Sequence, residues 1–262
     1  MRNILVTGGT GTLGSEIVRQ LLASGHEVSV LSSADNPVLP KQAKFCKGDL
    51  ETNRGLQQAV KNIDTIIHCA SNPREAEKID VPGTRYLLQA AKQAGINHFV
   101  YISIVGVDQS SFPYYKAKTE VEQMIRESGI PLSILRTTQF HDFVLYRIIR
   151  SFEQVAEPNI TIPEGLKFQT VDIREVAQRL VEISVNNPAG KLPDMGGPEI
   201  LSLEQMTRIY LEILGRRQKV IAQPIENEFF QIFRSGINLC PGNATGKITW
   251  EKFLRNHFEI GE

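Results

Sequence analysis

The N-terminal segment combines a short apolar run with closely spaced glycines, and this combination constrains the fold more than any other feature. Ile4–Thr7 precedes glycines at positions 8, 9, 11 and 14, and apolar residues then recur at helical spacing from Ile17 to Leu22. Glycines in such a strand–turn–helix unit permit a sharp turn, a close approach of backbone N–H groups to a pyrophosphate, and close packing of the helix on the strand. A helix N-terminus also favours anions. The pattern therefore predicts a dinucleotide-binding loop, with a purely structural glycine turn as the weaker alternative.

Short β-branched runs alternate with amphipathic stretches through the first two thirds of the chain, as in βαβ units built around a parallel sheet. Glycines 25, 95 and 129 each fall just past a helical pattern, where a left-handed C-cap favours glycine. The expected strands are 4–7, 27–31, 44–47, 65–68, 99–103 and 132–136, and the expected helices are 13–24, 53–61, 81–94, 114–128 and 173–185. The sequence therefore predicts an α/β fold with a doubly wound parallel sheet.

The regular alternation ends after about Thr137, where seven prolines divide the rest of the chain into short pieces. We expect residues 1–137 to form a nucleotide-binding domain to which 165–186 returns. Residues 138–164 and 187–262 are expected to form a smaller substrate-binding region. Within it, Ser202 and Gln205 match a capping box that opens a helix to about Leu214. Further helices are expected at 227–236 and around Trp250.

Composition argues against several classes of partner. The 29 basic and 29 acidic residues cancel, and no Lys/Arg run can neutralise a line of phosphates, so nucleic acid and membrane surfaces are not expected partners. No apolar stretch approaches the roughly 18 residues that span a bilayer, and no export signal is recognised. Cys46, Cys69 and Cys240 are odd in number and lack metal-ligand spacing. We therefore expect a reduced, cytoplasmic protein without a metal site.

Two serines stand where the cofactor preference is usually decided. Ser32 and Ser33 follow the second expected strand, at the position where an NAD-preferring site places a carboxylate against the ribose 2′-hydroxyl. Their hydroxyls can donate to a 2′-phosphate, which favours NADP(H) over NAD(H). No arginine stands there, however, and Asp35 follows closely. A serine-rich turn without a ligand stays open as the alternative.

Tyr114 and Lys118 lie four residues apart at the start of an expected helix, so their side chains share one face. A nearby ammonium favours phenolate over phenol, which allows a tyrosine to exchange a proton with a carbonyl or alcohol during hydride transfer. Such pairs are also common on helix surfaces without any function, and Tyr115 is a competing phenol. The position of the pair after the fifth strand favours the catalytic interpretation.

Taken together, these motifs resemble a short-chain dehydrogenase/reductase. The resemblance rests on the glycine loop, Gly48–Leu50, His68–Ser71, Tyr101–Ser103 and the Tyr114/Lys118 pair, and the run Leu135–Phe140 narrows it to the atypical, NmrA-like branch. It extends from Met1 to about Gly197. It implies a Rossmann-type doubly wound sheet with a small C-terminal substrate subdomain, and a NAD(P)-dependent oxidoreductase.

The resemblance also implies roles for individual residues. Asp49 and Leu50 would contact the adenine, although Asp49 can equally serve a turn. Residues 69–71 would line the adenosine ribose and pyrophosphate, and Lys118 would bond the nicotinamide ribose. The complete expected cofactor set is Gly8, Thr10, Gly11, Thr12, Leu13, Gly14, Ser32, Ser33, Asp49, Leu50, Cys69, Ala70, Ser71, Ser103, Lys118, Thr137 and Thr138.

Substrate contacts are expected from Gln139, Phe140 and His141, at the mouth of the cofactor site. For His141, a hydrogen-bonded histidine at a helix start is the favoured alternative. Active relatives carry a Ser or Thr about two residues beyond the position of Ser103, whereas this chain has Val105. This departure bears on whether the protein catalyses a reaction.

Two functions follow from these residues. The favoured one is an NADP(H)-dependent reductase or dehydrogenase that acts on a small carbonyl or quinone-like substrate, with Tyr114 as proton donor and Lys118 as its partner. The other is a non-catalytic regulatory protein that senses NADP(H) and signals to a protein partner. Isomerase or epimerase chemistry is a third, weaker possibility.

Overall fold

The computed structural model describes residues 1–260 and consists of two compact units. The first comprises 1–103, 110–136 and 174–193, and the second comprises 104–109, 137–173 and the chain from 194 onward. The segment that returns to the first unit was expected at 165–186. It begins later because Lys167–Phe168 pairs with a strand of the second unit, and it ends later because Gly190–Lys191 joins the main sheet.

A seven-stranded sheet forms the centre of the first unit, in the order β3-β2-β1-β4-β5-β6-β9. Parallel pairing sets Ile4 of β1 opposite Val28 of β2 and Thr65 of β4. The strands are β1 (Asn3–Thr7), β2 (Glu27–Ser32), β3 (Lys44–Lys47), β4 (Thr65–His68), β5 (His98–Ile104), β6 (Leu132–Thr137) and β9 (Gly190–Lys191). The predicted parallel sheet is confirmed. Strand β9 went unpredicted because two residues without an apolar run leave no periodic signal.

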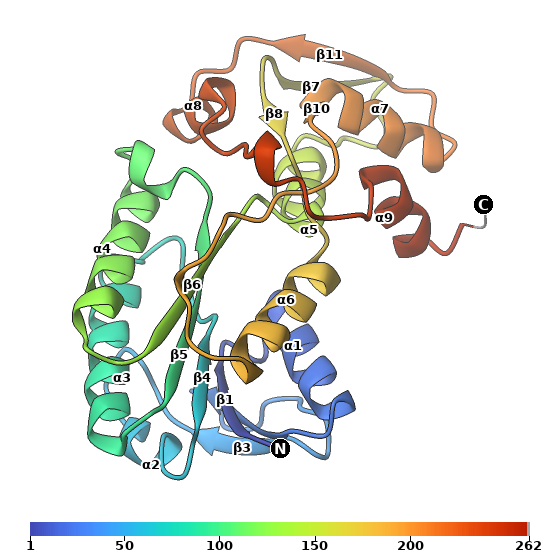
Figure 1. Ribbon diagram of the computed structural model, residues 1–262. Helices are drawn as coiled ribbons and strands as arrows, with labels where there is room; N and C mark the ends of the chain where they lie inside the picture. Colours follow the sequence, from blue (N-terminus) through green and yellow to red (C-terminus); the bar gives the residue numbers. More distant parts are fainter. Residues whose placement is uncertain (261–262) are drawn as a thin grey trace. The chain divides into compact units, whose positions relative to one another are not determined.

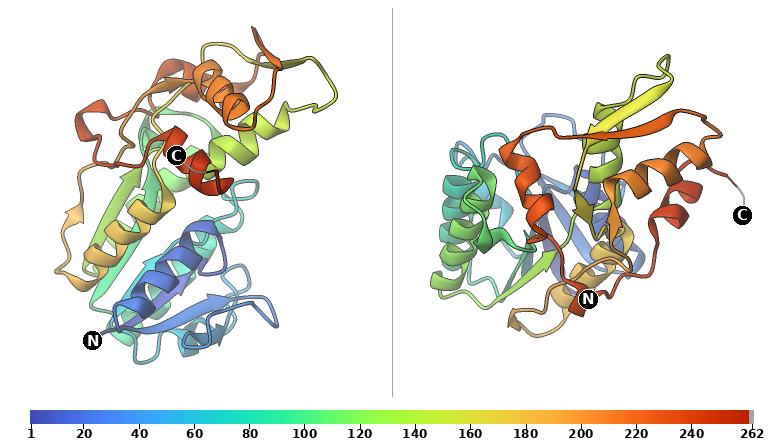
Figure 2. Two further views of the ribbon diagram at one scale, coloured as in Figure 1. Left: turned by 90° about the vertical axis from the view of Figure 1, so that its right-hand side faces the viewer. Right: turned by 90° about the horizontal axis from the view of Figure 1, so that it is seen from above.

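Helices cover both faces of this sheet, as expected for a doubly wound fold. Helices α1 (Thr12–Ala23) and α6 (Ile173–Val185) lie on one face, and α2 (Leu56–Ala59), α3 (Asp80–Ala94) and α4 (Pro113–Glu127) lie on the other (Figure 1). Helices α1 and α6 run side by side (Figure 2), joined by a 3.0 Å hydrogen bond from the Gln20 amide to the Arg174 carbonyl. Fully buried apolar residues, among them Leu5, Ile66 and Phe99, fill the space between the layers.

Backbone conformation accounts for where these helices end. Gly25, Gly95 and Gly129 adopt φ values of +76°, +69° and +75°, so the three predicted left-handed glycines are confirmed. Helix α2 is much shorter than the expected 53–61. Asn53 and Gly55 have φ values of 61° and 77°, which are incompatible with a right-handed helix, so α2 starts only at Leu56.

Within the described residues, the second unit contains two small strand pairs and four α-helices. Strand β7 (Asn159–Pro163) pairs in parallel with β11 (Lys219–Gln223), and β8 (Lys167–Phe168) pairs antiparallel with β10 (Leu201–Ser202). The helices are α5 (His141–Phe143), α7 (Leu203–Ile213), α8 (Glu228–Ser235) and α9 (Trp250–His257). Packing centres on aromatic side chains, with the Trp250 indole donating to the Met206 carbonyl at 2.9 Å.

The capping box predicted at the start of α7 is confirmed. The Ser202 hydroxyl accepts from the Gln205 backbone N–H at 3.2 Å, and the Gln205 side chain accepts from the Ser202 N–H at 2.8 Å. Within residues 1–260, the helices are all too short or too polar to serve as a membrane span.

Candidate cofactor and proton-transfer site

The glycine loop joins β1 to the first turn of α1 and is folded tightly on itself. An added Cβ on Gly14 would lie 2.1 Å from the Gly8 carbonyl oxygen, and one on Gly8 would lie 2.7 Å from the Ala70 nitrogen. Gly8 also has a φ of +69°. Side chains are therefore excluded at both positions, and the loop backbone comes close to the end of β4.

The first turn of α1 presents backbone rather than side chains to a ligand. Its N-cap is Gly11, no side chain in the described structure caps it, and its first turn contains no acidic residue. A Cβ on Gly11 would have a single neighbour within 4 Å, the Gly8 carbonyl oxygen at 3.3 Å. Thr10, Gly11 and Thr12 are exposed. This open, uncapped and positively polarised helix end fits the pyrophosphate of a dinucleotide.

A buried hydrogen-bond network holds the loop that follows β4. The Thr7 hydroxyl accepts from the N–H groups of residues 69 and 70 at 3.2 Å each and lies 2.7 Å from Nδ1 of His68. Burial, reinforced by the charge of Lys118, lowers the pKa of His68 to about 3, so its ring is neutral. The Thr84 hydroxyl donates to the Asp80 carbonyl, so it accepts from Nε2 of His68 at 3.0 Å, which leaves Nδ1 to accept from Thr7. The network fixes the ends of β1 and β4 against α3.

Asp49 serves the turn between β3 and α2. Its carboxylate accepts from the Glu51 N–H at 2.9 Å and from the Thr52 hydroxyl at 2.8 Å. Partial burial acts to raise the pKa of Asp49, but these hydrogen bonds outweigh it and lower the pKa. The turn role foreseen as the alternative is thus present. An ionised carboxylate retains further lone pairs, so contact with an adenine amine is compatible with it.

A cation that sequence reasoning missed lies beside Ser32 and Ser33. Lys47 is paired with Ser32 across the β2–β3 ladder, and its ammonium donates to the Ser33 carbonyl at 2.6 Å. The same ammonium lies 2.6 Å from the Asp35 carboxylate and lowers the pKa of Asp35. The basic residue that the end of the second strand lacks comes from elsewhere in the sheet. Strand pairing brings Lys47 from the third strand. The register between the second and third strands is the signal that would have located it.

Lys118 is a buried residue of α4, with 5% of its surface exposed. Its Nζ donates to the Ile102 carbonyl at 3.3 Å, bonds the Tyr101 hydroxyl, and lies 5.9 Å from the centre of the Tyr114 ring. Burial acts to lower the pKa of Lys118, but Tyr101, Tyr114 and Asp80 outweigh it and raise the pKa. The side chain is therefore a fixed buried ammonium.

Tyr114 is the phenol that reaches the loop after β4. Its side chain is partly buried, and its hydroxyl lies 3.0 Å from Oγ of Ser71. Ser71 in turn donates to the Asp80 carboxylate at 2.6 Å. Tyr115, the competing phenol, is only 3% exposed and packs edge-on against Phe112. Of the two tyrosines, Tyr114 thus has its hydroxyl among polar groups and its ring near the Lys118 ammonium.

Ser103 and Val105 occupy different surroundings. Ser103 is buried in β5 and acts with Arg136 to hold the pKa of Glu122 low against the effect of burial. Glu122 also pairs with Arg136 at 2.7 Å and Arg126 at 2.8 Å. Val105, in the second unit, is 3% exposed, and its N–H donates to the Thr137 carbonyl at 2.9 Å. An apolar side chain therefore stands at the position where the family resemblance implies a hydroxyl.

The remaining expected residues belong to the second unit. Thr137 and Thr138 are buried, and Gln139 accepts from the Asn238 amide at 3.1 Å. Phe140 is partly exposed and directly precedes α5.

His141 is fully buried at the start of α5. Its Nδ1 lies 2.7 Å from the Thr170 hydroxyl, its Nε2 lies 3.0 Å from the Ile248 carbonyl, and its ring stacks on Phe253. The structure favours the helix-start interpretation over a substrate contact.

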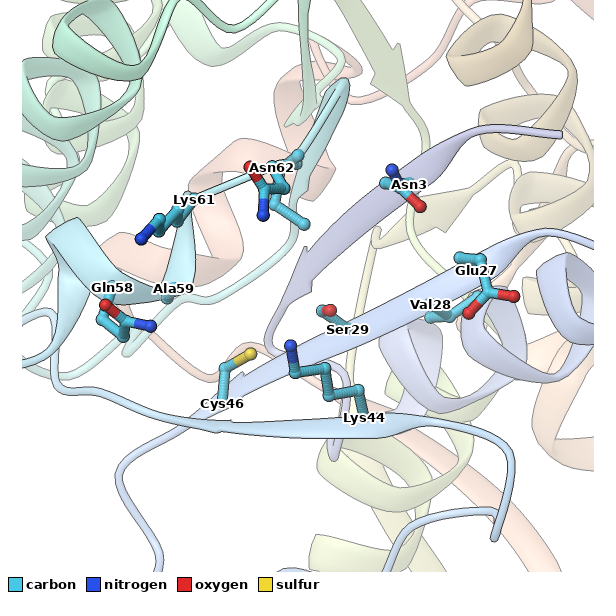
Figure 3. A pocket seen from close by; sticks show the side chains of 11 residues that line it. Asn3, Glu27, Val28, Ser29, Lys44, Cys46, Gln58, Ala59, Lys61 and Asn62 are labelled. Atoms are coloured by element: carbon cyan, nitrogen blue, oxygen red, sulfur yellow. The ribbon is translucent and has the colours of Figure 1, made fainter.

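One pocket of the first unit lies away from these residues. It is lined by Asn3, Glu27 and Lys44 at the amino ends of β1, β2 and β3, together with Gln58, Lys61 and Asn62 near α2 (Figure 3). None of the predicted site residues lines it. Ligands of open parallel sheets bind at the carboxyl ends of the strands, where the glycine loop lies, so this pocket is not the cofactor site.

Comparisons with known proteins identify the family and the fold of this chain. The model of the NmrA-like family matches residues 1–262. Photosystem II assembly factor Ycf39 of Guillardia theta is 25% identical, over 98% of this chain and 85% of the relative. The chloroplastic divinyl chlorophyllide a 8-vinyl-reductase of Arabidopsis thaliana is 22% identical, over 86% of this chain and 60% of the relative. The NADPH complex of the quinone oxidoreductase QOR2 of Escherichia coli has the same fold, with a TM-score of 0.81, 18% identity and coverage of 97% and 99%.

Proposed function

We propose that this chain, which belongs to the NmrA-like family, is an NADP(H)-dependent oxidoreductase that acts on a small carbonyl or quinone-like substrate. The observation that carries the proposal is Tyr114, whose hydroxyl lies among polar groups while its ring is 5.9 Å from the buried ammonium of Lys118. A reductase among the relatives and an NADPH-dependent quinone oxidoreductase among the structural neighbours support the reaction and the substrate class.

Each part of the first unit has a defined role in this proposal. When bound, the nicotinamide cofactor supplies or accepts a hydride. Backbone N–H groups of residues 12–14 hold the pyrophosphate at the start of α1. The Lys118 ammonium stabilises negative charge on the Tyr114 oxygen, so that Tyr114 donates a proton to a carbonyl oxygen or removes one from an alcohol. We leave His141 out of the substrate contacts because both of its ring nitrogens are engaged.

The test is NADPH oxidation by the purified protein against a panel of carbonyls and quinones. Tyr114→Phe keeps the ring and removes the proton, so we expect kcat to fall by about 10²- to 10⁴-fold. Tyr146→Phe, which alters an exposed tyrosine of the second unit, is the control and should keep wild-type turnover. Unchanged turnover in Tyr114→Phe would remove Tyr114 from the mechanism.

Preference for NADP(H) is part of the proposal and rests on Lys47. We propose that its ammonium, with the hydroxyls of Ser32 and Ser33, binds the 2′-phosphate and exchanges its contact with Asp35 for the ligand. Lys47→Gln should weaken NADPH binding by about tenfold or more, because a charge-assisted hydrogen bond is lost. NADH has no 2′-phosphate, so its binding should stay unchanged. Fluorescence titration with both cofactors measures this, with exposed Lys41→Gln as the control. An equal loss for both cofactors would contradict the assignment.

A non-catalytic NADP(H)-sensing regulator is the second candidate, favoured by two observations. Val105 is buried and apolar where active relatives have a hydroxyl, and one relative is named an assembly factor. Under this alternative the protein binds NADPH and NADP⁺ with different affinities, binds a partner protein in one of the two states, and turns over no substrate in the panel. Robust turnover would exclude a purely regulatory role.

We also propose a cytoplasmic location, which the three free cysteines support because they suit a reducing compartment. The relative named as chloroplastic provides the alternative of a reducing organelle. Cell fractionation with compartment markers distinguishes the two.

A further inference from the structure

We propose that Ser71 and Asp80 form a proton relay to Tyr114. The relay rests on the proposed oxidoreductase function. Its three side chains come from separate parts of the first unit: the loop after β4, the first residue of α3, and the first turn of α4. Ser71 and Tyr114 are 43 residues apart in sequence, so only the fold brings them together.

The direction of the two hydrogen bonds follows from donor counting. An ionised carboxylate only accepts hydrogen bonds, so the single hydroxyl proton of Ser71 is donated to Asp80, at 2.6 Å. Oγ of Ser71 can then only accept in its other short contact. The Tyr114 hydroxyl, 3.0 Å away, is therefore the donor. The chain runs Tyr114 to Ser71 to Asp80, with every proton assigned.

Asp80 is held firmly enough to serve as the end of such a chain. Its Oδ1 accepts from the Asn72 N–H at 2.8 Å, and its carbonyl accepts from the Thr84 hydroxyl at 2.6 Å. Thr84 is in turn bonded to the buried, neutral His68. The start of α3 adds a favourable helix dipole for the negative carboxylate. Asp80 is partly exposed and Ser71 is exposed, so water reaches the outer end of the relay.

The relay balances the proton that Tyr114 exchanges with a substrate. In alcohol oxidation, the Tyr114 proton passes to Oγ of Ser71 as the Ser71 proton passes to Oδ2 of Asp80. The resulting phenolate takes the substrate hydroxyl proton, and Asp80 releases its proton to water. Carbonyl reduction runs the same transfers backwards, with water protonating Asp80. The hydride of either direction is supplied or accepted by the nicotinamide and does not enter the relay.

Other ionisable groups surround the relay without replacing it. Lys118 of α4 carries a fixed positive charge whose field reaches Asp80, and Tyr101 of β5 is a buried phenol whose pKa is raised by burial. His68 of β4 is neutral over the working pH range. Asp80 is therefore the carboxylate that links Tyr114 to solvent through a hydroxyl.

The experiment measures kcat, its pH profile, its solvent deuterium isotope effect and NADPH affinity in Ser71→Ala, Ser71→Thr and Asp80→Asn. We expect Ser71→Ala and Asp80→Asn to lower kcat by about tenfold or more, and we expect Asp80→Asn to change NADPH affinity by less than about twofold. The pH profile of kcat should change in both variants. Ser71→Thr, which keeps a hydroxyl, should recover most of the rate. Ser111→Ala and Glu77→Gln, both exposed residues outside the relay, are the matched controls.

The outcomes separate the relay from the proposed function. Loss of turnover in Tyr114→Phe, combined with wild-type kcat and pH profile in Ser71→Ala and Asp80→Asn, would overturn the relay alone. No turnover by the wild-type protein on any substrate of the panel, or full turnover by Tyr114→Phe, would overturn the proposed function and the relay together. Asp80→Asn keeps the size of the side chain and an acceptor for Asn72, so a folding defect in Ser71→Ala does not leave the relay without a test.

Discussion

Gly11 and Gly14 belong to the same loop, yet an added methyl group meets different surroundings at each. On Gly14 it lies 2.1 Å from the Gly8 carbonyl oxygen, so the backbone of the loop must shift to make room for it. On Gly11 its single near neighbour is that same oxygen at 3.3 Å, and it otherwise faces open space. Gly14 is thus required for the folding of the loop, whereas Gly11 leaves space for a ligand.

We expect Gly14→Ala to lower the free energy of unfolding by about 1–3 kcal/mol, the usual cost of overpacking. Gly11→Ala should lower the free energy of unfolding by a smaller amount, about 0.5–1 kcal/mol, because alanine is a poorer N-cap than glycine. It should nevertheless weaken NADPH binding by roughly tenfold, since the methyl group occupies the space of the pyrophosphate. Urea unfolding and fluorescence titration measure both quantities. Equal effects of the two variants on stability would contradict this division of roles.

At the scale of elements, local signals decide where helices begin and end. Helix α7 starts at a capping box whose two hydrogen bonds are both formed, and Gly95 ends α3 in a left-handed conformation. Helix α2 is cut to four residues by the positive φ angles of Asn53 and Gly55. Asparagine tolerates this conformation, so the apolar pattern of 53–61 overstated the helix.

Ser202→Ala should lower the free energy of unfolding by about 1 kcal/mol, the typical cost of losing an N-cap side chain. Ser235 provides a control at the end of α8, where its hydroxyl donates to the Ile232 carbonyl of its own helix. Ser235→Ala should stay within about 0.5 kcal/mol of the wild type. Thermal and urea unfolding of both variants measure the difference. A Ser202→Ala variant as stable as Ser235→Ala would show that the capping box does not limit stability.

At the scale of the whole molecule, two buried histidines couple folding to pH. Burial lowers the pKa of His68 to about 3 and that of His98 to about 4, whereas both titrate near 6.5 in an unfolded chain. Between these values the unfolded state binds protons that the folded state does not. Their contribution to stability is therefore complete above about pH 6.5 and is lost as pH falls towards 4 and 3.

We expect the free energy of unfolding to fall between pH 6.5 and pH 5 with a slope approaching 1.4 kcal/mol per pH unit for each buried histidine. His68→Gln should be less stable at pH 7.5, because Thr7 and Thr84 lose their partner, but its slope should be shallower. His257→Gln alters an exposed histidine and should keep the wild-type slope. Above pH 5 most carboxylates stay ionised, so urea unfolding in this window isolates the histidines. A His68→Gln slope equal to the wild-type slope would refute the assignment.

Patterns that repeat over a few residues were enough to predict most of the first unit from the sequence. The six expected strands match β1, β2, β3, β4, β5 and β6 to within one residue at either end, and glycine spacing located the loop before α1. Apolar periodicity, caps and turns are local signals because each depends on residues within one or two turns of chain. Tyr114 and Lys118 were paired for the same reason, since four residues span one helical turn.

Contacts between distant residues were decided only by the tertiary structure. Strand β7 meets β11 across some 60 residues, and neither strand has a local pattern that names its partner. Lys47 reaches Ser33 through the register of β2 and β3, and Ser71 reaches Tyr114 through the packing of three separate elements. Side-chain roles of this kind depend on where backbones lie in space. The sequence by itself therefore determined the sheet and the glycine loop, whereas the fold decided which hydroxyl and which cation stand beside them.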